Sequence, residues 1–174
     1  PGCAAAQAGS LSTAIALGSI PLMLLFIARA ATPDYAYLVG RGRADITGPP
    51  LGVQLWGFVR ADQIDEGIHF RLFSRAFVIA ERKGDQRIVF ASLDLGSVTH
   101  AMHQEVVERL QKKYGKLYTE DNVILSATHT HSGPSGYWHY GTEGPIGMPL
   151  YTAHFEAIVQ GIVDSISQAH DDLQ

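Results

Sequence analysis

Two apolar runs joined by a short polar connection restrict the folds open to this chain more than any other feature. Residues 71–81 and 87–95 are both rich in Phe, Val and Ile. Lys83-Gly84-Asp85 lies between them, and a short polar connection that contains glycine is typical of a β-hairpin. We therefore expect two paired strands. The second run is almost entirely apolar, which predicts that it lies inside the sheet.

Further periodic segments complete an α/β pattern. Residues 38–46 predict a strand followed by a turn at Thr47-Gly48-Pro49-Pro50, and residues 122–128 predict another short strand. Between residues 97 and 113 apolar side chains recur every four positions, which indicates an amphipathic helix. A last helix is predicted from a stripe formed by Phe155, Ile158, Val159, Ile162, Val163 and Ile166. Strands followed by helices that cover them predict an α/β fold with a mixed sheet.

The first thirty residues are typical of a leader and not of a folded segment. An apolar run over residues 13–28 precedes the small-x-small sequence Ala28-Arg29-Ala30, as in a signal peptide cleavage site. The run is short for a bilayer core of about 30 Å, although a signal anchor is the alternative. We therefore expect residues 1–30 to be a signal peptide or leader and residues 31–174 to form the folded part. This predicts a protein of the secretory pathway that is secreted or associated with a membrane surface.

Charge and cysteine content narrow the possible functions. The formal net charge is -4 and no basic run is present, which argues against a nucleic-acid partner. The single cysteine, Cys3, lies in the predicted leader. The folded part therefore has no thiol for nucleophilic catalysis, for a cysteine-zinc site or for a disulfide framework.

A histidine motif follows the strand predicted over residues 122–128. It reads Thr128-His129-Thr130-His131-Ser132-Gly133-Pro134. Because side chains two apart on a strand point to one face, His129 and His131 are expected to approach one centre. Neutral imidazole is a common protein ligand for zinc. The same spacing also occurs in ordinary polar loops, so the motif alone allows either a metal site or a solvated loop.

Other chemically active side chains have competing interpretations. Tyr137, Trp138 and His139 could line an apolar substrate pocket or pack the loop onto the core. His154 begins the last predicted helix, where a solvated position is expected. His100 and His103 are expected to be solvated positions of the helix predicted over residues 97–113.

Two other sequence features are candidate sites, namely Asp94 and a glycine-rich segment. Asp94 ends the apolar strand, where it would be either a partner for a metal-binding histidine or part of the cap of the next helix. The segment Gly40-Arg41-Gly42-Arg43-Ala44-Asp45 has the wrong glycine spacing for a nucleotide-binding loop, and no helix is predicted after it. No Gly-x-Ser-x-Gly sequence is present, which argues against a serine hydrolase of that type.

From about Tyr37 to Gln174 the chain resembles the N-terminal part of the neutral (alkaline-type) ceramidases. The resemblance includes the histidine motif and several segments in the same order along the chain. These segments are Gly40-Arg41-Gly42-Arg43-Ala44-Asp45-Ile46-Thr47-Gly48-Pro49, Gly67-Ile68-His69-Phe70-Arg71-Leu72, Arg75-Ala76-Phe77, Arg109-Leu110-Gln111-Lys112-Lys113-Tyr114-Gly115, Asp121-Asn122-Val123, Gly161-Ile162-Val163 and Ser165-Ile166.

The resemblance implies a zinc amidase that splits ceramide into sphingosine and a fatty acid. In that family two His, a Glu and a Tyr hold the zinc. The first ligand would be His129, while His131 would lie beside the zinc and face the substrate. The remaining ligands are expected from a later part of a longer chain, so residues 31–174 would be an incomplete N-terminal portion of a larger catalytic domain. The implied partners are ceramide at a membrane or micelle surface and the C-terminal part of the same polypeptide.

The chain also departs from the family pattern. Where the family usually has Met-Met-Gly-Tyr, this chain reads Gln54-Leu55-Trp56-Gly57-Phe58. The loop over residues 141–149 also differs from the family pattern. Both departures bear on which ceramide chains the enzyme would prefer in its substrate. A competing interpretation is a non-catalytic fragment, or a lipid- or partner-binding module that uses the aromatic loop without metal.

Overall fold

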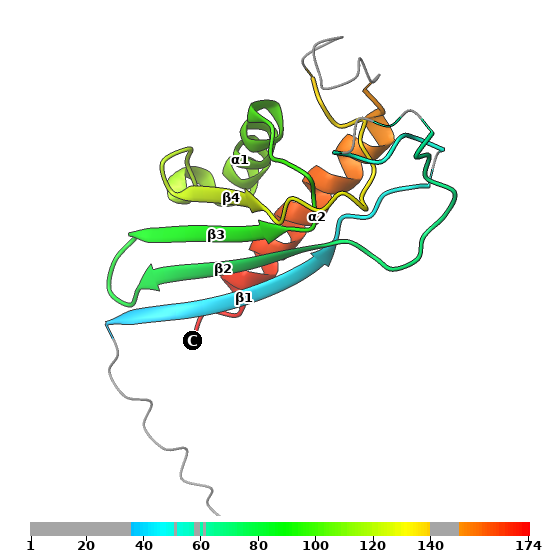
Figure 1. The fold of residues 1–174 in the computed structure, drawn as a ribbon. Helices are drawn as coiled ribbons and strands as arrows, with labels where there is room; N and C mark the ends of the chain where they lie inside the picture. Colours follow the sequence, from blue (N-terminus) through cyan, green and yellow to red (C-terminus); the bar gives the residue numbers. More distant parts are fainter. Residues whose placement is uncertain (1–35, 51, 58–59, 61, 140–149) are drawn as a thin grey trace, which may run out of the picture. The chain divides into compact units, whose positions relative to one another are not determined.

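The computed structural model describes residues 36–50, 52–57, 60, 62–139 and 150–174, so the predicted leader lies outside the described residues. Within those ranges no helix combines the length and the apolar character needed to cross a membrane. Figure 1 shows one sheet with two long helices. The elements are β1 (Tyr37–Asp45), β2 (Phe73–Glu81), β3 (Arg87–Leu93), α1 (His100–Tyr114), the 3-10 turn η1 (Gly115–Leu117), β4 (Val123–Ala127) and α2 (Thr152–Asp171).

The sheet is mixed, as predicted, with the strand order β1-β2-β3-β4. β1 and β3 both pair antiparallel with β2, whereas β4 pairs parallel with β3. The predicted hairpin joins β2 to β3, and the backbone N–H of Glu81 donates to the carbonyl of Gln86 over 2.9 Å. β3 lies between β2 and β4, which confirms its predicted interior position. Because β3 and β4 are parallel, the chain needs a crossover between them, and α1 provides it.

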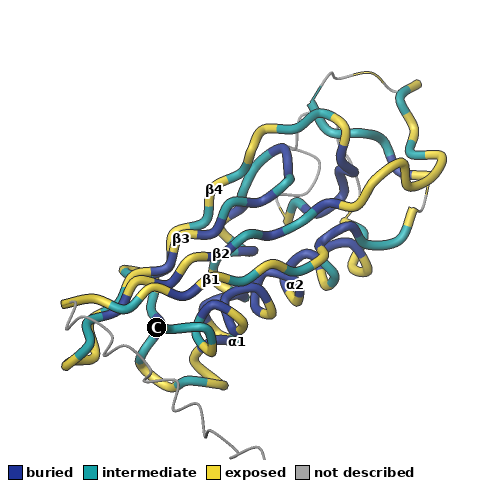
Figure 2. Tube along the Cα trace, turned by 90° about the horizontal axis from the view of Figure 1, so that it is seen from below, coloured by how far each residue is buried: buried dark blue, intermediate teal, exposed yellow. Residues whose placement is uncertain are grey.

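Both helices pack on the same face of the sheet (Figure 2). α1 begins after Thr99, whose hydroxyl accepts from the backbone N–H of Met102 over 3.2 Å and caps the helix. The stripe predicted for the last helix is buried along α2 and faces the sheet. Together these surfaces enclose a core whose largest wholly buried side chains include Tyr118, Leu93, Leu110, Ile158, Ile162 and Ile166.

The glycines of β1 allow α2 to pack directly against the sheet. A Cβ on Gly40 would lie 1.9 Å from the carbonyl oxygen of Ala169, and one on Gly42 would lie 2.0 Å from that of Ser165. Only glycine permits this approach between the strand and helix backbones. The backbone N–H of Arg41 also donates to the Asp172 carboxylate over 3.0 Å, which covers part of the sheet edge. The glycine-rich segment therefore serves helix packing.

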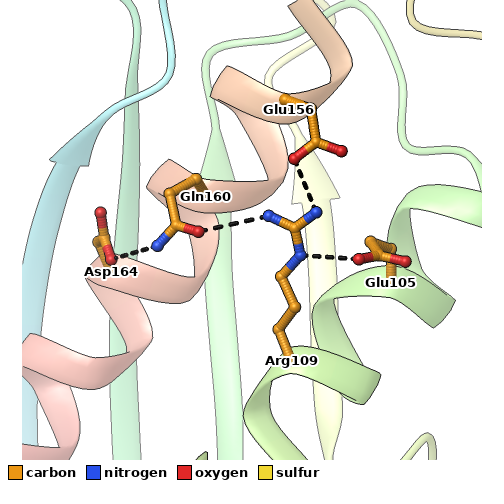
Figure 3. A network of polar contacts seen from close by, with 5 residues as sticks. All are labelled: Glu105, Arg109, Glu156, Gln160 and Asp164. Carbon is orange, nitrogen blue, oxygen red and sulfur yellow. Dashed lines mark hydrogen bonds and ion pairs between the residues drawn. The ribbon is translucent and has the colours of Figure 1, made fainter. Parts of the chain in front are cut away.

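A polar network joins the outer sides of α1 and α2 (Figure 3). The Arg109 guanidinium donates to Glu105 one turn before it and to Glu156 of α2, each over 2.7 Å. It also donates to Gln160 over 3.3 Å, and Gln160 in turn donates to Asp164 over 2.8 Å. Partly exposed ion pairs of this kind each contribute roughly 0–1 kcal/mol, so the network orients the helices more than it stabilises the fold.

The face of the sheet away from the helices is apolar and, within the described residues, uncovered. Five of its large side chains come from β2, β3 and β4, and each is between 42% and 46% exposed. They are Phe77, Ile79, Ile88, Phe90 and Ile124. A contiguous apolar surface of this kind marks an interaction surface more often than a solvated one.

Candidate functional site

The histidine motif lies where the parallel strands β3 and β4 end. The backbone N–H of Thr128 donates to the Leu93 carbonyl over 2.9 Å, and that of Thr130 donates to the Leu95 carbonyl over 3.2 Å. The two segments that follow the strands therefore run side by side. The carboxyl ends of parallel strands are where α/β proteins commonly bind ligands, so the fold places the motif at a favourable edge.

The two histidines come together, although not in the way that the spacing predicts. β4 ends at Ala127, and His129 has a φ of 63° in the left-handed region. The motif is therefore a turn and not a straight continuation of the strand, and the prediction of one strand face was wrong. A left-handed conformation at a residue other than glycine costs about 1 kcal/mol or more and concentrates at functional sites. The imidazole centroids of His129 and His131 nevertheless lie 5.0 Å apart.

The orientation of the His129 ring determines which of its nitrogens can bind a metal. Nδ1 lies 3.0 Å from the carbonyl oxygen of Gly96. A carbonyl only accepts hydrogen bonds, so Nδ1 carries the proton and donates. The Nε2 of the neutral ring then keeps its lone pair, and the ring is exposed. This arrangement, in which a backbone carbonyl fixes the tautomer, is the one found at metal-binding histidines.

Trp56 contacts both histidines of the motif. Its ring centroid lies 4.9 Å from that of His129 and 5.4 Å from that of His131, with edge-on geometry in both cases. The backbone N–H of Trp56 donates to the Gly133 carbonyl over 3.0 Å. Sequence reasoning did not assign Trp56 to the site, and the only signal was its place in the segment that departs from the family pattern.

The segment that carries Trp56 pairs with the residues just after the motif. Leu55 forms an antiparallel bridge with Pro134. The Gln54 carbonyl accepts from both the backbone N–H and the hydroxyl of Ser135, over 3.0 and 2.6 Å. A cavity of about 320 Å³ adjoins this pairing and is lined by Leu55, Pro134, Ile64, Ile68 and Phe70 together with acidic residues. The site thus has an apolar hollow beside it.

The predicted substrate-contacting residues lie in different surroundings. Tyr137 is wholly buried, and its hydroxyl accepts from the backbone N–H of Ser97 over 3.2 Å. Burial raises the pKa of Tyr137, and the bond from Ser97 opposes that rise. Trp138 is partly buried against the core, whereas His139 is exposed and packs edge-on against Phe155 at 4.3 Å. Tyr137 therefore packs the loop onto the core, which is one of the two alternatives that the sequence left open. Substrate contact by the three residues stays a prediction, and the loop over residues 141–149 lies outside the described residues.

Two expectations about the other histidines had different outcomes. His154 is wholly buried, so the prediction of a solvated position was wrong. The reason is that the start of α2 packs against the turn after β1, where the His154 ring lies between the carbonyls of Pro49 and Ser135. His100 is exposed as expected, but His103 is partly buried and its Nε2 lies 2.8 Å from the Val123 carbonyl.

Asp94 is not the cap of α1, and its role as a partner for a metal-binding histidine stays a prediction. Its carboxylate accepts from the Phe73 backbone N–H over 3.0 Å and from Arg75 over 2.8 Å. The hydrogen bond from Arg75 to Asp94 raises the pKa of the Arg75 guanidinium. The cap of α1 is Thr99, so Asp94 ties the end of β3 to β2 and is not itself the helix cap.

The described residues do not form a complete metal site. They contain no group of three or more His, Cys, Asp or Glu side chains placed to hold a metal ion. Protein zinc sites need at least three protein ligands. His129, with its tautomer fixed by Gly96, fits one such ligand, and its partners would have to come from elsewhere.

Comparisons with known proteins identify the family to which the chain is similar. A family model described as "Neutral/alkaline non-lysosomal ceramidase, N-terminal" matches residues 37–174. "Neutral ceramidase 2" of Arabidopsis thaliana is 45% identical over 153 residues, which are 88% of this chain and 20% of that protein. "Neutral ceramidase" of Pseudomonas aeruginosa is 43% identical over 165 residues, which are 95% of this chain and 24% of that protein.

Solved structures give the same result. The crystal structure of neutral ceramidase from Pseudomonas aeruginosa matches with a TM-score of 0.76 at 44% identity, covering 81% of this chain and 22% of that one. A structure of a ceramidase complexed with C2 matches with a TM-score of 0.77. The mixed sheet and its helices therefore correspond to the N-terminal part of a larger fold, and the chain spans only 20% to 24% of the length of these curated relatives.

Proposed function

The chain belongs to the neutral/alkaline non-lysosomal ceramidase family, and from this premise we propose that it supplies one side of the active site of a zinc-dependent ceramide amidase. The reaction is hydrolysis of the amide bond of ceramide to sphingosine and a free fatty acid. The observation that supports the proposal best is the hydrogen bond between His129 Nδ1 and the Gly96 carbonyl, because it leaves Nε2 as a ligand atom. Activity belongs to a polypeptide of family length, because the relatives are four to five times longer than this chain.

His129 is the residue of this chain that would hold the zinc. Bound zinc supplies a Lewis acid for the amide carbonyl. The Gly96 carbonyl keeps the His129 ring in one tautomer and one orientation, which lowers the cost of fixing it when the metal binds. The left-handed backbone at His129 sets the direction in which the ring leaves the strand end.

His131 has a different role in the proposed reaction. Its ring is partly buried and lies 5.0 Å from that of His129, so it faces the same small volume. From there it would donate a hydrogen bond to the oxyanion that develops on the amide carbonyl, or to the primary hydroxyl of the sphingoid base. A donor aimed at developing charge contributes about 10²–10³ in kcat at comparable sites.

The substrate reaches this site from a lipid phase. Trp138 and His139 are proposed to contact ceramide, and Tyr137 beneath them holds the start of their loop on the core. Ceramide is presented at a membrane or micelle surface, which agrees with the proposed route through the secretory pathway and with a secreted or membrane-surface location.

A second candidate function is a lipid- or partner-binding module without catalysis. Two observations favour it for the chain on its own. The described residues hold no set of three metal ligands, and one face of the sheet is apolar and uncovered. In this case the aromatic residues after the motif would bind a lipid or a protein, and zinc would have no effect.

A chimera separates the two candidates. Residues 37–174 replace the corresponding segment of the Pseudomonas aeruginosa enzyme, and hydrolysis of a short-chain ceramide is measured with and without a zinc chelator. We expect zinc-dependent hydrolysis that His129→Ala abolishes, and a loss of about 10²-fold in kcat for His131→Ala. His100→Ala is the matched control, because His100 is exposed on α1 and is not part of the motif.

The results of the chimera experiment distinguish the two candidate functions. A folded chimera that hydrolyses no ceramide, or one in which His129→Ala keeps full activity, would overturn the proposed zinc role. His131→Ala with wild-type turnover would remove only the role of His131. Ceramide binding by the chain alone that is independent of zinc and of His129 would support the binding module.

A further inference from the structure

Trp56 is the centre of a cluster of three aromatic rings at the motif. Its indole meets the His129 imidazole at an interplanar angle of 77° and the His131 imidazole at 61°. The two imidazoles also meet each other edge-on at 63°. Each ring is thus held by the other two. Edge-on contact is a preferred geometry of aromatic pairs, so these contacts favour one orientation of each ring.

The surrounding backbone leaves room for these rings at two glycines. A Cβ on Gly96 would lie 2.1 Å from Cδ2 of Trp56, and one on Gly57 would lie 2.5 Å from Cδ2 of His131. Gly96 is also the residue whose carbonyl orients His129. The indole therefore lies directly on the residue whose carbonyl fixes the His129 tautomer.

Hydrogen bonding by the indole does not explain its position. Nε1 of Trp56 is buried and has no hydrogen-bond partner within the described ranges. Burying a polar group without a partner is unfavourable, and a purely apolar side chain would avoid that cost. The ring of Trp56 contacts the two histidines and Gly96 and packs against the core, so its shape is what the site uses.

We infer that Trp56 is a positioning residue that fixes both histidines and holds His129 in the Nδ1–H tautomer. The inference rests on the proposed function in one respect, namely that His129 Nε2 is a metal ligand. Loss of the indole frees the His129 ring to rotate. The affinity of His129 for zinc then falls, because residues that orient a ligand typically change metal affinity 10- to 100-fold.

The test compares ring removal at two places in the chain. The measurements use the chimera, whose remaining part supplies the other zinc ligands. Imidazole ¹⁵N chemical shifts report the tautomer of each histidine at pH 8, and the same signals report binding when the metal-free chimera is titrated with Zn²⁺ alone. For Trp56→Leu we expect the Nδ1–H tautomer of His129 to lose its dominance and the apparent Kd for Zn²⁺ to rise about 10-fold. Trp56→Phe keeps an aromatic edge and is expected to retain the wild-type tautomer.

Tyr114→Leu is the matched control. Its ring packs on a histidine as well, 4.4 Å from His170, but at the opposite end of α1. This variant should leave His129 unchanged in both measurements. Trp56→Leu with the wild-type tautomer and zinc affinity would overturn the inference. If Trp56→Leu does not fold, the wild-type chain decides, because absent nuclear Overhauser contacts between the indole and either imidazole would overturn it too.

His129→Ala distinguishes this inference from the proposed function. If His129→Ala binds Zn²⁺ as tightly as the wild type, the proposed metal role of His129 fails whatever Trp56 does. If His129→Ala loses binding and Trp56→Leu keeps it, the metal role stands and only the positioning role of Trp56 fails.

Discussion

The layer between α2 and the sheet differs from the turn that carries the histidine motif in its packing and in its backbone strain. Under α2 the backbones of strand and helix touch at glycines, and the hydroxyls of Ser74 and Ser165 are hydrogen-bonded to each other over 2.7 Å. At the motif, His129 has a left-handed backbone, and the buried Nε1 of Trp56 lacks a partner among the described residues. One region packs two backbones closely, while the other holds backbone strain.

This difference separates stability from function within one small fold. Strained backbone and unpaired polar groups persist only where the rest of the structure over-determines them, and they cluster at sites of binding and catalysis. The motif is attached through backbone hydrogen bonds to the ends of β3 and β4, so the sheet supplies the rigidity that the turn lacks. Substitutions under α2 should therefore act on folding, and substitutions at the motif should act on ligand binding.

The largest effect is expected where α2 crosses β1. In Gly42→Ala the new methyl group would meet the Ser165 carbonyl oxygen at 2.0 Å, and neither backbone can move without separating helix and strand. Overpacking of this kind destabilises by about 3 kcal/mol or more when the obstacle is backbone. The free energy of unfolding in urea measures it.

Gly67→Ala is the control for that substitution. A Cβ on Gly67 meets nothing within 4 Å, so we expect a change within about 0.5 kcal/mol. If the two variants had similar stabilities, the close approach of α2 to β1 would not be a determinant of the fold.

A smaller effect is expected from pH, again on the helix side. Burial lowers the pKa of His170 below 6.5, and the nearby charge of Arg87 adds to the shift, while Asp171 opposes it. The neutral ring suits its site, because Nδ1 lies 2.7 Å from the Tyr118 hydroxyl, which can donate to it. The folded pKa is depressed, so the stability that His170 contributes is present above 6.5 and is lost as the pH falls through the folded pKa.

Urea unfolding at pH 7.5, 6.5 and 5.5 measures this dependence. His170→Gln cannot take up the proton, so its stability should fall less between pH 7.5 and 5.5 than that of the wild type. If both proteins lost the same free energy of unfolding between pH 7.5 and 5.5, the pKa of His170 would be the same in the folded and the unfolded chain.

The sequence was most informative for the layer under α2. Apolar runs between turn residues predicted the four strands, and apolar stripes predicted both long helices, because burial leaves such patterns in the sequence. The role of Gly40 and Gly42 was not predicted, since their meaning depends on a helix more than a hundred residues later. Likewise His154 was expected in solvent, because nothing local shows that the turn after β1 covers the start of α2.

The motif was predicted less completely. Its residues were recognised by their type and by a family resemblance, but the turn at His129 and its bond to Gly96 arise from contacts between segments far apart in sequence. Trp56 was noticed only as a departure from the family pattern. Its contact with both histidines depends on the pairing of Leu55 with Pro134, which has no local signature.

The smallest effect on stability is expected at the motif, where one substitution gives opposite results in the two regions. His129→Gly removes a side chain from a left-handed position, and the relief of about 1 kcal/mol is offset by the greater flexibility of glycine in the unfolded chain. We expect the free energy of unfolding to change by less than about 1 kcal/mol while zinc binding at the motif is lost. His103→Gly, inside α1, should instead destabilise by about 1 kcal/mol or more, because glycine is unfavourable within a helix and the contact with the Val123 carbonyl is lost. If His129→Gly proved the more damaging of the two, the strain at the motif would be a requirement for folding, and the division between a stable layer and a strained site would not hold.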